Sequence, residues 1–284
     1  MAWVWDPLRL TFREAEVEEL YDAWSECKSG AELGACVMGM ITCSRILVAK
    51  GGQEGFWRMI LVVGANLSWS LAGVCMAVVS GKRHNRLRPF LVGAVHCSGF
   101  LMGLTDIRVP SRVASVSDAL VALLLQSPVS FTLFASIFLP LRFRDVLKTH
   151  IFFAISIVYF SSSDFCALPD DGESEGADLP PYSEIGERID RIFEMTLFKS
   201  IRLNDEHRCS CEAVATFIFL VAGVFIPLLF SYFKEVISRC LFLRAWMPVE
   251  YRKGIWSSVK FGLEFSISLV IVGMQITWIV FRKL

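Results

Sequence analysis

Long apolar runs without charge divide the chain. The clearest four cover residues 59–81, 119–141, 213–233 and 261–281, and Glu264 is the one charged residue in them. A helix that crosses the hydrocarbon core of a bilayer needs about 17–25 mostly apolar residues. Each run has this length, so the pattern predicts four transmembrane helices.

Two further runs have the same character. Residues 89–105 are uncharged but contain His96, and residues 151–168 are interrupted by Asp164 near their end. If these two runs did not cross the membrane, their many apolar side chains would need another apolar environment. We therefore expect both runs to cross the membrane as well.

A seventh candidate span covers residues 33–49. It is short and contains Arg45, which lies near the C-terminal end and can extend its charged group to the interface. The alternative is an amphipathic helix on the membrane surface. The fold expected for residues 31–284 is an all-α, polytopic membrane bundle of seven helices, or six without this span.

The composition supports this class. Hydrophobic residues make up 54% of the chain and charged residues 20%, which is apolar for a soluble domain. The net charge is zero, so no overall charge favours a nucleic-acid partner. The first residues, MAWVWDPLRL, lack the basic start and apolar core of a signal peptide, so we expect the first transmembrane helix to direct insertion.

Lysine and arginine in the short loops predict the orientation, because these residues resist translocation. They concentrate in 82–88, 142–148 and 234–259, which lie on one side if the spans are right. The opposite side carries segment 169–211, with eleven acidic residues and five basic ones. The basic side is expected in the cytosol of a plasma membrane or endomembrane protein. The acidic segment and the C-terminus are then extracytosolic, and seven spans place the N-terminus in the cytosol.

Two segments outside the bilayer show helical apolar stripes. In residues 1–30 the stripe predicts an amphipathic cytosolic segment packed on the bundle. Residues 183–203 predict a second amphipathic helix over the outer mouth of the bundle, or a lid over a pocket. The first stripe consists of Leu10, Phe12, Val17, Leu20, Tyr21 and Trp24.

The nine cysteines show no paired CxxC motifs, which argues against a zinc site. In the extracytosolic region Cys166 is expected to pair with Cys209 or Cys211, or these thiols stay free. His207 stands beside the last two, but a fourth metal ligand is not evident. We therefore expect no metal.

Known catalytic motifs are missing from the sequence. There is no HExxH, no P-loop and no GxSxG, and only four histidines occur. We expect no catalytic residues, no cofactor and no enzyme activity.

Polar residues within the spans are more informative, because burying them in lipid is costly. We interpret His96, Gln126 and Asp164 as lining a ligand pocket; the alternative is interhelical hydrogen bonds that fix the packing. Pro128 and Pro227 lie within spans and are expected to kink them.

The last span carries a spaced motif. It reads Ser268, Leu269, five apolar or small residues (VIVGM), Gln275 and Ile276. It resembles the Thr-Tyr, five apolar residues, Gln-Phe pattern in the last helix of insect gustatory and odorant receptors and their plant and protist relatives. Ser replaces Thr here, and Leu and Ile replace the two aromatic residues, while the spacing to the glutamine matches.

This resemblance to the seven-helix receptors implies a tetrameric, ligand-gated cation channel. Gln275 and Ser268 would lie at its pore or gate, and a small molecule would bind among the upper halves of the earlier helices. A small-solute transporter or a non-catalytic membrane scaffold remains open as an alternative. The expected partners are the lipid bilayer, further copies of the chain and a small-molecule ligand.

Overall fold

The computed structural model describes residues 5–6, 10–26, 56–79, 81–105, 115–125, 128–138, 141–161, 166, 180–196, 211–247 and 255–283 of the 284-residue chain. Nearly all of these residues are helical, which confirms the expected mostly helical fold. The predicted span 33–49 lies outside the described residues.

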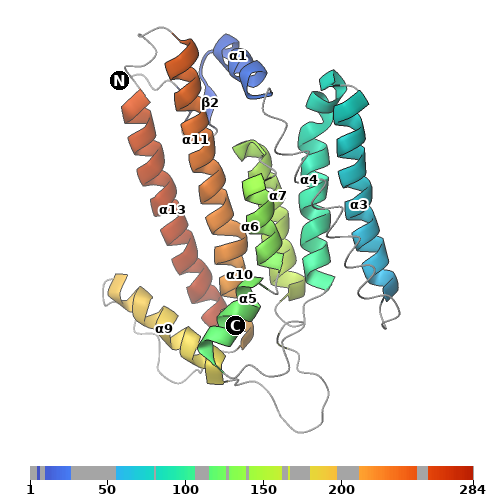
Figure 1. Cartoon of the computed structure of the whole chain (residues 1–284). Helices are drawn as coiled ribbons and strands as arrows, with labels where there is room; N and C mark the ends of the chain where they lie inside the picture. Colours follow the sequence, from blue (N-terminus) through green and yellow to red (C-terminus); the bar gives the residue numbers. More distant parts are fainter. Residues whose placement is uncertain are drawn as a thin grey trace.

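The helices form an elongated bundle in which they run in alternating directions (Figure 1). An N-terminal unit of two paired strands and one helix covers one end of it. The elements, in chain order, are β1 (Trp5–Asp6), β2 (Thr11–Phe12), α1 (Ala15–Glu26), α3 (Phe56–Val79), α4 (Gly81–Thr105), α5 (Val116–Leu125), α6 (Pro128–Phe138), α7 (Phe143–Ser156), η1 (Ile157–Ser161), α9 (Pro180–Thr196), α10 (Cys211–Leu220), η2 (Val221–Phe225), α11 (Ile226–Trp246) and α13 (Ile255–Lys283).

Among the described residues, two helices are long and apolar enough to cross a membrane. They cover Cys211–Trp246, which comprises α10, η2 and α11, and Ser257–Phe281 within α13. Both contain runs that the sequence marks as spans, and both extend beyond those runs toward the same end of the bundle. The first is largely buried within the bundle, whereas almost none of the second is covered.

The run 119–141 differs from the continuous helix expected there. The structure divides it into α5, of 10 residues, and α6, of 11 residues. Each is about 15 Å long, roughly half the thickness of the hydrocarbon core. Pro128 is the first residue of α6, where its missing N–H group has no intrahelical partner to lose. Two separate helices, α5 and α6, are thus described on either side of residues 126–127, which lie outside the described residues.

At the second proline the helix continues, with a local change of geometry. Pro227 follows η2, a π-helical segment over Val221–Phe225. In a regular α-helix the proline ring would collide with the carbonyl group four residues earlier, which belongs to Gly223. The wider π turn lies where this collision would occur, so α10, η2 and α11 form one long, modified helix.

The basic segments gather at one end of the bundle, which we call the basic end. α4 and α7 begin there, α11 ends there and α13 begins there, beside α1 (Figure 1). The opposite end carries α9, α5 and the C-terminus (Figure 1). This arrangement agrees with the grouping of segments 82–88, 142–148 and 234–259 that the charge pattern indicates.

Two main apolar clusters hold these elements together. The larger joins α5, α7, α9, α10, η2 and α13 around side chains such as Phe153, Phe219 and Trp278. The smaller lies at the basic end, between the N-terminal unit and α11. The bundle is thus packed separately toward its two ends.

Candidate functional site

The long last helix, α13, carries a polar stripe on a face that the bundle leaves uncovered. Ser257, Lys260, Glu264 and Ser268 all have exposed side chains. Successive helical residues are about 100° apart, so these four positions fall within one quarter of the helix circumference. Lys260 and Glu264 form an ion pair of 3.9 Å on this stripe.

The opposite face of the first half of α13 packs on α11. Gly262 is buried, and a side chain there would overlap the hydroxyl group of Tyr232. Ser258 is buried, and the hydroxyl group of half-buried Ser266 donates a 2.7 Å hydrogen bond to the carbonyl of Gly262. The polar stripe therefore points away from the bundle, where a helix in lipid would present apolar side chains.

The two residues predicted for a pore both lie on α13. Gln275 is half-buried toward the end that carries α9, and Ser268 donates a 2.7 Å hydrogen bond to the carbonyl of Glu264. Gln275 follows Ser268 by seven residues, or about two turns, so it continues the same stripe.

Of the three residues predicted for a ligand pocket, the structure describes His96 alone, and it lies away from this stripe. His96 is buried within α4, which α11, α6 and α7 separate from α13 (Figure 1). Gln126 and Asp164 lie outside the described residues. The ligand pocket therefore stays a prediction.

Polar groups near His96 fix the packing of α3 on α4. The side-chain amide of Asn66 donates hydrogen bonds to the carbonyl of Val95, at 3.1 Å, and to the hydroxyl of Ser98, at 2.9 Å. Asn66 and Ser98 are both buried. Such bonds between apolar helices are the structural role considered for the polar residues within the spans.

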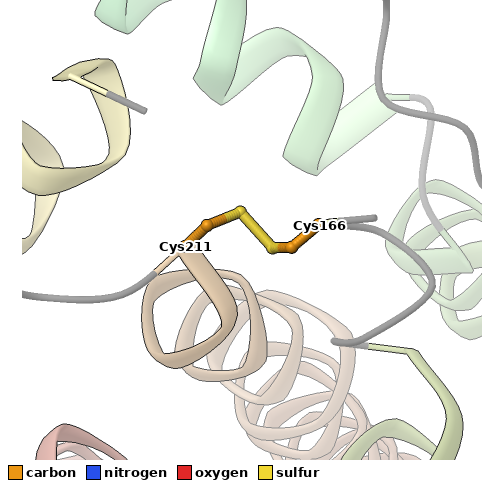
Figure 2. Close-up of a disulfide and its surroundings, with 2 residues drawn as sticks. All are labelled: Cys166 and Cys211. Atoms are coloured by element: carbon orange, nitrogen blue, oxygen red, sulfur yellow. A yellow bond between two sulfur atoms is a disulfide. The ribbon is translucent and has the colours of Figure 1, made fainter. Parts of the chain in front are cut away.

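A disulfide joins Cys166 to Cys211 at the end of the bundle that carries α9 (Figure 2). The two Cα atoms are 6.1 Å apart, and the residues are separated by 45 positions in the sequence. Cys211 is the first residue of α10, so the bond ties the chain after η1 to the start of the long helix. Cys209, the other expected partner, lies outside the described residues.

The amphipathic helix α9 covers this end of the bundle. Tyr182 and Ile185 are buried in the larger apolar cluster, while Glu184 and Arg188 form an exposed ion pair. The indole N–H of Trp278 donates a 2.8 Å hydrogen bond to Asp190, which connects α9 to α13. The sequence shows the stripe of α9, but nothing in its periodicity pairs Asp190 with an aromatic residue near the C-terminus.

We expect Asp190→Leu to lower the free energy of unfolding by about 1–3 kcal/mol, because the buried indole N–H of Trp278 loses its acceptor. Thermal unfolding in detergent, followed by tryptophan fluorescence, measures this loss. The neighbouring Arg191→Leu removes an exposed charge and serves as the control. Equal unfolding temperatures of the two variants would show that the Trp278 contact does not hold α9 in place.

The chain was also compared with known proteins. No protein-family model, no curated protein and no solved structure matches it.

Proposed function

We propose that the chain is a multi-pass membrane protein that works as a chemoreceptor-like, ligand-gated cation channel, with α13 along the pore of a homo-oligomer. The polar stripe on the uncovered face of α13 carries this proposal. The spacing of Ser268 and Gln275, which resembles the last helix of gustatory and odorant receptors, adds to it.

Exposed apolar side chains on many helices support the placement in a membrane. A soluble protein rarely exposes large contiguous apolar surfaces, whereas lipid chains solvate them without cost. They lie on α3, α4, α7, α11 and α13, and include Leu71, Phe90, Ile151, Ile155, Ile226, Ile237, Leu269 and Ile276.

The charge and the disulfide suggest the orientation. Basic segments favour the cytosol, and disulfides persist in oxidising compartments such as the lumen or the cell exterior. The basic end and the Cys166–Cys211 end lie at opposite ends of the bundle (Figure 1, Figure 2). In the proposed orientation the N-terminus is cytosolic and the C-terminus extracytosolic, in the plasma membrane or an endomembrane. Protease access to tags at the two termini tests it, since termini on one side would contradict it.

Lengths along α13 support a position of Glu264 within the bilayer. Trp278 contacts α9 at the outer end, and tryptophan is common at membrane interfaces. Glu264 lies 14 residues earlier, or about 21 Å along the helix, whereas the hydrocarbon core is about 30 Å thick. With Trp278 at the outer interface, Glu264 lies within the hydrocarbon core, roughly 9 Å from the opposite interface. An exposed carboxylate at this depth is costly in lipid and favourable beside water.

An assembly of several copies provides such water. When α13 helices from several subunits surround an axis, their stripes face one another and enclose a polar path. Rings of glutamate favour cations, and rings of amide and hydroxyl groups replace part of an ion's hydration shell. A ligand bound among the earlier helices would then change the packing of α13.

Conductance of the purified protein in lipid bilayers tests the proposal. We expect Gln275→Leu to lower the cation conductance by about tenfold, because losing one polar contact of about 1.4 kcal/mol raises the barrier by that factor. Ile276→Leu changes the adjacent, exposed apolar residue and is expected to leave the conductance unchanged.

The assembly is tested separately. Chemical cross-linking in native membranes is expected to give homo-oligomers, up to a tetramer if the resemblance to the receptors holds. A protein that stays monomeric in native membranes would contradict the channel. Oligomers whose conductance Gln275→Leu leaves unchanged would remove this residue from the pore.

A further inference from the structure

At the basic end, residues 5–6 and 10–26 form a small folded unit that holds two helices of the bundle by charge. We propose that this N-terminal unit is a releasable latch that keeps the basic ends of α7 and α11 together. The proposal concerns the conformation of the bundle, and it does not depend on whether the chain conducts ions.

The centre of the latch is Arg239 of α11. Its side chain is only 2% exposed, although it carries a permanent charge. Two of its nitrogens contact the two carboxylate oxygens of Glu18, at 2.7 and 2.8 Å, and its Nε donates to Glu235 at 3.0 Å. Glu235 belongs to the same helix as Arg239, whereas Glu18 belongs to α1. Of these ion pairs, the one with Glu18 therefore joins α1 to α11.

Aromatic rings of the N-terminal unit complete the enclosure of Arg239. The guanidinium carbon lies 4.7 Å from the ring centre of Phe12 and 4.2 Å from that of Tyr21. Both rings also contact Phe242 of α11, at centroid distances of 5.9 and 5.4 Å. Apart from Glu235 of its own helix, the arginine is therefore surrounded by groups that would leave together if the N-terminal unit moved away.

A second ion pair extends the latch to α7. Asp22 lies one helical turn after Glu18 on α1 and contacts Arg142 at 2.6 Å. Arg142 directly precedes α7, and Phe143, its neighbour, packs edge-on against Tyr232 of α11 at 5.2 Å. Two carboxylates on one face of α1 thus hold arginines from two different helices.

Contacts within the N-terminal unit hold Glu18 in position. The amide of Phe12 donates a 2.7 Å hydrogen bond to Glu18, which fixes the carboxylate beside the β1–β2 hairpin. Leu10 adopts a positive φ of 50° in the turn between the strands, which costs about 1–3 kcal/mol in a non-glycine residue. Docking offsets this strain, because Leu10 is buried in the smaller apolar cluster.

The latch depends on the charge of Glu18. Removing one partner of a buried ion pair is strongly unfavourable, because the other charge stays buried without compensation. Burial alone would raise the pKa of Glu18, but hydrogen bonds from Arg239 and from the amide of Phe12, with the charge of Arg239, hold that pKa below its ordinary value. Glu18 therefore stays ionised at cytosolic pH, and a change that removes or competes for its charge would release α1.

Cys240 provides a natural reporter of release. It lies on α11 next to Arg239, is half-buried and packs against the cluster that includes the N-terminal unit. Cys97 of α4 is also half-buried but packs against the other cluster. Maleimide labelling of intact membranes, resolved by residue with mass spectrometry, compares the two cysteines in one sample.

We expect Glu18→Arg to raise the labelling rate of Cys240 by about tenfold or more, because breaking a buried ion pair costs several kcal/mol. The rate at Cys97 is expected to stay unchanged. Glu19→Arg makes the same charge change at an exposed position of α1 and is the matched control. Equal rates at Cys240 in the two variants would overturn the proposal.

A charge exchange separates release of the latch from general unfolding. Asp22→Arg is expected to expose Cys240, and Asp22→Arg combined with Arg142→Asp is expected to protect it again, because the ion pair is rebuilt with opposite signs. The latch is refuted if Asp22→Arg exposes Cys97 as well and the double variant leaves Cys240 exposed. The charges would then support the fold generally.

A distance measurement tests whether the latch holds α7 and α11. Nitroxide labels at Lys148→Cys of α7 and Arg244→Cys of α11, both exposed positions, report the separation of the basic ends. Every cysteine except Cys166 and Cys211 is replaced by serine for this purpose. We expect Glu18→Arg to broaden and lengthen this distance. An unchanged distance with a released N-terminal unit would overturn the proposal that the unit holds the two helices together.

Discussion

Replacing Cys166 with serine is expected to lower the free energy of unfolding by about 4 kcal/mol, given the 45-residue separation of the bonded cysteines. The disulfide closes the segment that contains α9, and without it the unfolded chain regains the conformational freedom of that loop. The folded state also loses a covalent tie between η1 and α10. Such a loss is a large part of the typical total stability of a domain.

Thermal unfolding of the detergent-solubilised protein, with and without reductant, measures this effect. Cys211→Ser and the double serine variant should unfold at the same temperature as Cys166→Ser, because all three remove one bond. Cys75→Ser is the control, since Cys75 is an exposed free thiol on α3. A Cys166→Ser protein as stable as this control would show that the bond does not form in the folded protein.

Replacing Gly99 with alanine is expected to destabilise the bundle by about 1–3 kcal/mol, the usual cost of overpacking. Gly99 is a buried residue of α4, and a methyl group at this position would overlap the ring of Phe131 on α6. The ring lies against the bare backbone, so α4 and α6 would have to separate or Phe131 would have to leave its position. The change should therefore loosen the contact between these helices.

The same substitution at Gly93 of α4 is the matched control. A methyl group there meets no atom within 4 Å. Alanine is a better helix former than glycine by about 1 kcal/mol, so Gly93→Ala should be neutral or slightly stabilising. Adding Phe131→Ala to Gly99→Ala should relieve the overlap, and the unfolding temperature of the double variant tests this. If Gly99→Ala and Gly93→Ala are equally stable, α4 and α6 are not in close contact.

Some features of the fold could be predicted from neighbours along the chain. The apolar runs 213–233 and 261–281 are contained in the two helices long and apolar enough to span a membrane. The apolar stripe of the N-terminal segment is confirmed in part: Val17 and Tyr21 are buried on α1, whereas Leu10 and Phe12 belong to the hairpin before it and Leu20 is exposed. The described part of residues 183–203 lies on α9, where Ile185 is buried. Run length and periodicity depend only on which residues lie close in sequence, so these expectations needed no tertiary contacts.

Other features could not be predicted from run length and periodicity. Pro128 indicates a kink in the run 119–141, but the run is uncharged throughout, so hydropathy gives no sign that it forms two separate helices, α5 and α6. Arg239 counts in the sequence only as one basic residue among several, yet it is buried against Glu18, 221 positions away. His150 is buried as well, with Nδ1 2.9 Å from the carbonyl of Val146, and nothing in the apolar pattern distinguishes it.

The candidate site shows the same division. The sequence supplies the spacing of Ser268 and Gln275, and hence the stripe that runs through Glu264, because residues on one helix keep a constant angular relation. Which face of α13 the bundle covers depends on Gly262 meeting Tyr232 and on Trp278 meeting Asp190. Those contacts join residues 30 and 88 positions apart, and only the packing of the whole bundle brings such residues together, because no local interaction fixes their separation.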